Sequence, residues 1–256
     1  VMYIDDELQG EKETTKASKV LDLFRTNPNQ HIKIETWNNM PTAAGLSSSS
    51  SGLSALVKAA NELFQVGKTQ SELAQIAKFA SGSSSRSFFG PLAAWDKDSG
   101  EVYQVETDLK LAMIMLVLTD QKKPVSSRDG MKLCTETSTS FPEWIKQSEQ
   151  DYKDMLGYLK ANDFQAVGEL TEANALRMHQ TTSTANPPFS YLTDASYQAM
   201  DKVKALRASG EQCYFTMDAG PNVKVLCLEE DLDRLADHFR KDYDVIVSRT
   251  KELLDD

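Results

Sequence analysis

The chain has 256 residues and a formal net charge of −10 at pH 7, and 40% of its residues are hydrophobic. Such a chain can bury a sizeable core in one or two domains, and its negative charge argues against nucleic acid as a partner. The longest apolar run, residues 111–118, is too short to span a bilayer, so no membrane segment is expected. Three cysteines without paired metal spacing (Cys134, Cys213 and Cys227) predict reduced thiols in a cytoplasmic protein.

The beginning of the chain is polar and leads into a helix-like segment over residues 16–25 and an expected strand over residues 31–37. The first residue is Val1, and neither an initiator methionine nor a signal peptide precedes it. We therefore expect the sequence to lack the start of the protein.

A serine run follows, in the segment Pro41 to Gly52. A flexible linker is one interpretation of such a run, but the next residues repeat at the spacing of one apolar helix face. These residues are Leu53, Leu56, Val57, Ala60, Leu63 and Phe64. The start of a helix exposes unpaired backbone N–H groups and the positive end of the helix dipole. The segment therefore predicts a phosphate-binding site, in which serine oxygens can also contact a metal ion.

A second cluster of small and hydroxyl residues covers Ser81 to Gly90 and adds one cation, Arg86. The helix between the two clusters has a clear beginning: Gly67 ends the preceding helix, Thr69 can cap the new one, and Glu72 occupies the reciprocal capping-box position. A helical hairpin that joins the clusters allows both to line one cleft for a polyanionic ligand.

Several familiar motifs are excluded by their spacing. Residues 67–69 look like the end of a Walker A loop, but that loop needs glycine where Glu62 stands. Neither a G-x-G-x-x-G motif after a strand nor a G-x-S-x-G elbow occurs. The acidic residues of Asp96 to Gly100 lack the rest of a calcium loop and indicate a hairpin turn within a strand pair at about 93–105.

The second half of the chain continues this α+β pattern, and we place a domain boundary near Asp108, with domains 1–108 and 109–256. Its elements are expected as a strand over 109–120, long helices within 142–180 and 193–209, strands near 213–217 and 223–227, a helix, and a last strand near 244–248.

Two loops in this half carry polar side chains that suit chemistry. The loop Lys122 to Gly130 contains Lys122, Lys123, Ser126, Ser127 and Arg128, and is either a solvated turn or a clamp for phosphate or carboxylate. The loop Asp218 to Asn222 lies between two strands, where Gly220 and Pro221 force a sharp turn. Asp218, at a strand end, is a candidate base.

Other residues are better explained by structure. His179 is expected to cap carbonyls at a helix C-terminus, and His31 and His238 are isolated. Three residues that alternate along an apolar strand are predicted to pack in the core: Met113, Met115 and Val117.

Three motifs together make the chain recognisable: PTAAGLSSSSSG (41–52), GSSSRS (82–87) and TMDAGPNVK (216–224). They resemble the diphosphomevalonate decarboxylases, of the GHMP family of small-molecule kinases, over essentially the whole chain. A kinase of the wider family usually has a second glycine where Ala43 or Ala44 stands. The departures are the five consecutive serines, where the family commonly has Ala-Ser-Ser-Ala-Ser, and the lack of an N-terminal motif that helps to bind the substrate.

The resemblance implies a two-domain GHMP fold, with an N-terminal nucleotide-binding domain like domain 2 of ribosomal protein S5 and a ferredoxin-like C-terminal domain. Members of the family use ATP and Mg²⁺ to phosphorylate the tertiary hydroxyl of mevalonate 5-diphosphate. Loss of phosphate and carbon dioxide then gives isopentenyl diphosphate, in the mevalonate pathway of isoprenoid biosynthesis. The resemblance also implies a cytoplasmic homodimer with its active site between the domains.

The resemblance also assigns roles to individual residues. Asp218, Arg86 and Ser48 are the expected catalytic residues: Asp218 takes or orients the hydroxyl proton, and Arg86 holds the substrate carboxylate. The other substrate-binding residues are Ser83, Ser127, Arg128 and Ala219, of which Ser127 and Arg128 hold the diphosphate. The nucleotide is expected to contact Pro41, Ala44, Gly45, Leu46, Ser47, Ser48, Ser49, Ser50, Ser51 and Gly52, with Ser48 and Ser49 at Mg²⁺.

Alternatives remain open at this point. A related GHMP-family kinase would stop at the phosphate ester, and a phosphomevalonate decarboxylase would act on the monophosphate. A chain that truly begins at Val1 could instead bind phosphate or nucleotide without catalysis.

Overall fold

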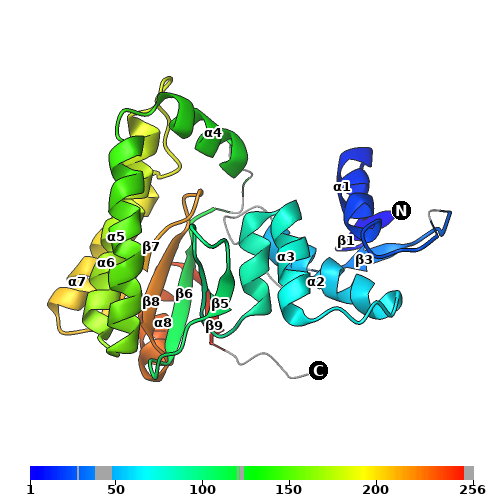
Figure 1. Cartoon of the computed structure of the whole chain (residues 1–256). Coiled ribbons are helices and arrows are strands. Elements are labelled where there is room, and N and C mark those ends of the chain that lie inside the picture. Colours follow the sequence, from blue (N-terminus) through cyan, green and yellow to red (C-terminus); the bar gives the residue numbers. More distant parts are fainter. Residues whose placement is uncertain (28, 38–47, 120, 122–123, 251–256) are drawn as a thin grey trace. The chain divides into compact units, whose positions relative to one another are not determined.

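The structure is a computed structural model that describes all residues except 28, 38–47, 120, 122–123 and 251–256 (Figure 1). The chain divides into two compact units, one built from the described residues up to Val105 and the other from Glu106 to Thr250. None of the helices in the described part is long and apolar enough to cross a membrane.

The N-terminal unit combines short strands with three α-helices and one 3₁₀ helix. Its elements are β1 (Met2–Ile4), β2 (Glu7–Leu8), α1 (Glu11–Leu21), β3 (Ile34–Thr36), α2 (Ser48–Leu63), α3 (Gln70–Ala80), the 3₁₀ helix η1 (Gly82–Phe88), β4 (Ala93–Trp95) and β5 (Val102–Gln104). The first three strands form a sheet in the order β2-β1-β3, in which β1 and β3 are parallel. The pair β1 and β2 was not expected, because this polar segment lacks the apolar alternation of a strand.

The core of this unit forms where α1, α2 and α3 bury their apolar faces together with Phe88 of η1. Val57 and Ala60 are almost completely buried, as the helix periodicity predicts, and Leu53 is 8% exposed. Leu63 was predicted on the same face but is 60% exposed, because α2 ends there and nothing in the core reaches its last position.

Local signals in this unit predict the structure well. Thr69 caps α3 and forms the expected capping box with Glu72. The strands β4 and β5 pair antiparallel, and Asp96 accepts hydrogen bonds from the backbone N–H groups of Asp98 and Ser99 at 3.0 and 2.7 Å. The segment is therefore the predicted hairpin turn.

The C-terminal unit contains an antiparallel sheet in the order β7-β8-β6-β9. Helices α5, α6 and α7 lie together beside this sheet in Figure 1. The elements are β6 (Leu111–Val117), α4 (Ser127–Thr137), α5 (Phe141–Lys160), α6 (Phe164–Ser183), α7 (Asp194–Ala208), β7 (Cys213–Thr216), β8 (Val223–Leu228), the short 3₁₀ helix η2 (Glu229–Asp231), α8 (Leu232–Phe239) and β9 (Asp244–Arg249).

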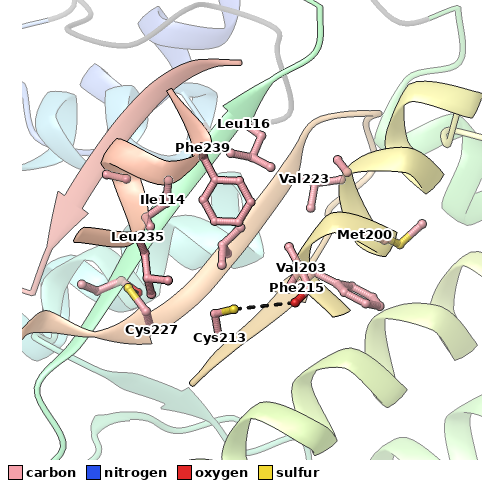
Figure 2. Packing of buried hydrophobic residues seen from close by; sticks show 14 of the residues in the cluster. Ile114, Leu116, Met200, Val203, Cys213, Phe215, Val223, Cys227, Leu235 and Phe239 are labelled. Atoms are coloured by element: carbon pink, nitrogen blue, oxygen red, sulfur yellow. Dashed lines mark hydrogen bonds between the residues drawn. The ribbon is translucent and has the colours of Figure 1, made fainter. Parts of the chain in front are cut away.

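The main core of this unit lies on one face of the sheet, against α7 and α8 (Figure 2). The side chains that β6 contributes are Ala112, Ile114 and Leu116, each at most 2% exposed. The prediction that Met113, Met115 and Val117 pack in the core is therefore confirmed for Met115, which is buried, but not for Met113 and Val117, which are only half-buried. An apolar run without polar alternation cannot tell which of its two faces is more deeply covered.

The cysteines are buried and free, as predicted. Burial raises the pKa of the Cys213 thiol to about 11 and that of Cys227 to about 12, so both thiols are protonated at neutral pH. Figure 2 shows the Cys213 thiol directed at the backbone oxygen of Val203, at 3.8 Å.

Helix α6 covers the open edge of the sheet at β7. The backbone N–H of Phe215 donates to Glu172 at 3.0 Å, and Glu172 is held in turn by Arg207 at 2.7 and 3.0 Å. Gly168 lets α6 approach closely, because a β-carbon at this position would overlap the ring of Tyr214. In the described sheet β7 is an edge strand, and the backbone N–H of Phe215 is therefore hydrogen-bonded by a side chain and not by another strand.

Candidate functional site

The serine run leads into a helix, as predicted, but α2 begins within the run at Ser48, four residues before Gly52. Residues 41–47 fall outside the described residues, and with them the expected contacts of Pro41, Ala44, Gly45, Leu46 and Ser47. The side chains of Ser48 and Ser49 are likewise not described, whereas Ser51 and Gly52 lie on the accessible first turns of the helix.

Hydroxyl groups join the first serine cluster to the second. The hydroxyls of Ser50 and Ser83 lie 2.6 Å apart. The hydroxyl of Ser54 lies 2.9 Å from the backbone oxygen of Ser50 and 2.8 Å from that of Ser84, so it bridges α2 and η1. Within this unit the two clusters therefore meet, as the helical hairpin between them predicts.

The second cluster is a 3₁₀ helix, η1, and it presents Arg86 to solvent. Among the described residues, the Arg86 guanidinium makes neither a hydrogen bond nor an ion pair with another side chain. By contrast, the Ser84 hydroxyl is fully buried without a partner among them. An exposed cation beside a serine-rich helix start suits a ligand that carries several negative charges.

The segment predicted as a loop from Lys122 to Gly130 becomes helical at Ser127, where α4 begins. Ser126 is the N-cap, and its hydroxyl accepts from the backbone N–H of Asp129 at 3.1 Å. Ser127 and Arg128 are exposed on the first turn, as a clamp requires, whereas Lys122 and Lys123 lie outside the described residues. The sequence gave little indication of α4, because this segment has few apolar residues and they form only a short apolar face.

Tyr191 holds the beginning of α4 in place. Its hydroxyl donates to the backbone oxygen of Ser126 at 3.1 Å. Gly130 makes this approach possible, since a β-carbon there would overlap the Tyr191 hydroxyl. The position of Ser127 and Arg128 is therefore set by packing between α4 and the segment that precedes α7.

The loop from Asp218 to Asn222 connects β7 and β8 and is held on two sides. The Asn222 side chain accepts from the backbone N–H groups of Leu118 and Thr119, at 2.7 and 3.1 Å, which fastens the loop to the end of β6. The Ser196 hydroxyl at the start of α7 donates to the Pro221 oxygen at 2.7 Å. The loop is thus anchored, while the Asp218 side chain remains 59% exposed.

Lys224 forms an ion pair with the Asp218 carboxylate. Lys224 belongs to β8 and is only 8% exposed. The sequence analysis missed it because one lysine within the apolar strand VKVLCL is usually an outward-facing residue. One feature of the sequence could have indicated it: Lys224 comes two residues after the loop that carries the candidate base Asp218.

His179 lies beneath the same loop, in the final turns of α6, and is 6% exposed. Neither ring nitrogen makes a hydrogen bond of normal geometry within the described part of the chain, so the prediction that His179 caps helix carbonyls is wrong. Burial lowers the pKa of His179, and the neighbouring backbone of Met217 and Asp218, with the Asp218 charge, opposes that shift in part. The ring is therefore neutral near pH 7.

Among the described residues, no group of three or more His, Cys, Asp or Glu side chains is arranged to hold a metal ion. A hard cation such as Mg²⁺ binds instead through a few oxygens of the protein together with phosphate oxygens of a bound substrate. Hydroxyl groups at the start of α2 are of that chemical type.

The fold and these polar sites define the class, a mixed helix and sheet protein of the GHMP type. Residues 1–105 match the diphosphomevalonate decarboxylase-like N-terminal domain, and residues 113–254 match the mevalonate 5-diphosphate decarboxylase C-terminal domain. The chain therefore belongs to the diphosphomevalonate decarboxylase family, and the resemblance carried by the three sequence motifs is confirmed.

Solved structures and curated relatives agree with this assignment. Mevalonate pyrophosphate decarboxylase from Streptococcus pyogenes is 67% identical with a TM-score of 0.94, over 99% of this chain and 80% of that chain. MDDEF in complex with MVAPP, AMPPCP and magnesium is 39% identical with a TM-score of 0.88, over 98% of this chain and 80% of that chain. Diphosphomevalonate decarboxylase of Candida albicans is 33% identical over 214 residues, which are 80% of this chain and 59% of the relative. This chain thus spans little more than half the length of its curated relatives.

Proposed function

We propose that the chain catalyses the ATP-dependent decarboxylation of mevalonate 5-diphosphate to isopentenyl diphosphate, with ADP, phosphate and carbon dioxide as the other products. The observation that carries the proposal is the anchored Asp218 loop, in a chain that matches both domains of the family. The structure of MDDEF with MVAPP, AMPPCP and magnesium supports the same substrate, ATP and Mg²⁺ for this chain.

The residues at the start of α2 fit the phosphates of ATP. Backbone N–H groups at a helix start and nearby hydroxyls donate to phosphate oxygens without adding positive charge. The residues that would hold ATP are Pro41, Ala44, Gly45, Leu46, Ser47, Ser48, Ser49, Ser50, Ser51 and Gly52, with the Ser48 and Ser49 hydroxyls also at Mg²⁺. Bound ATP supplies the phosphoryl group that turns a poor leaving group, hydroxide, into a good one.

The substrate is held by charge and by hydroxyl groups. Arg86 holds the carboxylate that leaves as carbon dioxide, Ser127 and Arg128 hold the diphosphate, and Ser83 and Ala219 complete the contacts. Asp218 takes or orients the proton of the tertiary hydroxyl. Loss of phosphate would leave positive charge on the tertiary carbon, and the electrons of the breaking bond to the carboxylate neutralise it.

Finer features of the protein are part of the same proposal. The strand order β7-β8-β6-β9, with all neighbours antiparallel and helices after β6 and β8, supports a ferredoxin-like C-terminal domain. We assign the N-terminal domain to the type of ribosomal protein S5 domain 2, with the boundary near Asp108. A cytoplasmic location and a homodimer complete the proposal.

A coupled assay of the full-length protein tests the proposed function, with ATP, Mg²⁺ and mevalonate 5-diphosphate as reactants. Equal release of ADP and carbon dioxide is expected. Release of ADP alone would indicate a kinase, and release of neither would contradict the reaction. Activity with the monophosphate in place of the diphosphate would correct the substrate.

A further inference from the structure

Lys224 is a nearly buried lysine within the sheet of the C-terminal unit. It lies on β8, the strand between β7 and β6, where its register neighbours are Thr216 and Met115. Its side chain is 10% exposed. Removing an ammonium group from water is costly unless a partner compensates for the lost hydration. A nearly buried lysine is therefore expected to have an anionic partner.

The ion pair with Asp218 supplies such a partner. The ammonium contacts one carboxylate oxygen, Oδ2, whereas the Asp218 side chain as a whole is 59% exposed. The two groups thus differ in surroundings: the cation is inside and the anion is at the surface. Because the loop is anchored through Asn222 and Ser196, the backbone of Asp218 is held independently of this ion pair.

We propose that Lys224 is a positioning residue that fixes the side-chain rotamer of Asp218 and leaves its second carboxylate oxygen free for the hydroxyl of the substrate. This inference rests on the proposed function, in which Asp218 takes or orients the proton of that hydroxyl. In this proposal Lys224 acts on the reaction through Asp218 and does not contact the substrate itself.

The pairing also favours one of the two roles of Asp218. The ion pair to a nearly buried ammonium holds the Asp218 carboxylate in one orientation, which is what a group that orients a hydroxyl requires. Phosphoryl transfer has a loose transition state and needs orientation of the nucleophile more than removal of its proton. His179 on α6 also lies beside Asp218, and because burial lowers its pKa, its neutral ring adds no positive charge there near pH 7. Lys224 thus suits an Asp218 that orients the hydroxyl.

Steady-state kinetics of the full-length protein tests this role with three variants. Lys224→Met keeps the length of the side chain but removes the ammonium, and Lys224→Arg keeps a charged donor. Lys146→Met is the matched control, because Lys146 is exposed on α5. For Lys224→Met we expect kcat to fall about 10²-fold with KM nearly unchanged, as for a misplaced catalytic group. Lys224→Arg should recover at least about tenfold of that loss, as one charged hydrogen bond can.

A stability cycle separates positioning from general packing. Asp218→Asn should lower the melting temperature, since the ammonium of Lys224 loses this partner, and adding Lys224→Met should restore part of the loss. Effects that add without coupling would overturn the pairing, whatever the activity of the variants.

The outcomes distinguish the inference from the function on which it rests. Normal kcat for Lys224→Met, or a loss confined to KM, would overturn the positioning role alone. Wild-type protein without turnover, or Asp218→Asn with a near-normal rate, would overturn the proposed function of Asp218 and the role of Lys224 with it.

Discussion

The serine-rich region of the N-terminal unit and the Asp218 loop of the C-terminal unit are both polar, but they are built differently. In the first, neutral hydroxyls contact one another and backbone oxygens, and Arg86 stands exposed. In the second, a carboxylate pairs with a lysine that the sheet buries, and the loop is anchored by its own Asn222 at the end of β6 and by Ser196 of α7. The first region thus offers several neutral donors spread over α2 and η1, whereas the second offers one carboxylate that its ion pair holds in place.

This difference fits two different tasks. Binding a polyphosphate needs many weak donors, each of which contributes little by itself. Orienting one hydroxyl needs a single group at a defined position, so its supports matter as much as the group itself. Mutations should therefore separate the two regions: a few large effects on turnover in the second, and graded effects on binding and stability in the first.

The largest effect is expected for Asp218→Asn. The amide keeps the shape of the side chain but removes its charge, so turnover should fall about 10²- to 10⁴-fold, while substrate affinity changes by only a few-fold. Rates of ADP and carbon dioxide release and calorimetric binding of substrate measure the two quantities. Asp237→Asn, at an exposed carboxylate on α8, is the control. A variant of near-normal rate would remove Asp218 from the reaction.

A smaller effect is expected for Arg86→Gln. Loss of one charge-assisted hydrogen bond to the substrate carboxylate should reduce kcat/KM by about tenfold to hundredfold. The melting temperature should not change, because Arg86 is exposed. Arg240→Gln, at an exposed arginine of the other unit, controls for the loss of one positive charge. If Arg86→Gln lowered stability and left kcat/KM unchanged, the residue would be structural.

Ser54→Ala should reduce stability more than catalysis. Its buried hydroxyl donates to the backbone oxygens of Ser50 and Ser84, and loss of such a hydrogen bond costs about 0.5–1.5 kcal/mol. The higher helix propensity of alanine returns up to about 0.5 kcal/mol. Urea unfolding measures the difference against Ser71→Ala, at an exposed serine of α3. Equal stability of the two variants would mean that the bridge between α2 and η1 contributes nothing.

The smallest effect concerns the pH dependence of stability through His179. Burial lowers the pKa of His179 below its usual value of 6.5, so below about pH 6.5 the unfolded chain binds a proton more readily than the folded chain does. The free energy of unfolding should therefore fall as the pH drops through this region, by at most about 1.4 kcal/mol per pH unit. Denaturant titrations at several pH values should show a smaller slope for His179→Gln. An unchanged slope would assign the pH dependence to other groups.

Several features that depend only on neighbours in the sequence were predicted correctly. The capping box of Thr69 and Glu72, the hairpin turn at Asp96 and the helix that begins in the serine run all follow from residues a few positions apart. Their hydrogen bonds or apolar spacing are local, so the order of residues suffices. The family resemblance is of the same kind, because three short motifs carry it.

Features that depend on distant segments were not predicted. The more deeply buried face of β6 depends on which helices cover the sheet. The helical hairpin predicted that the two serine clusters meet, but not that Ser50 and Ser83, 33 positions apart, make the contact. The burial of Lys224 follows from its place on the strand between β7 and β6. The sequence by itself determined the family, the motifs and the local caps, since these need only neighbouring residues. The tertiary structure decided which charges are buried and which groups meet, because burial and pairing arise only when distant segments pack together.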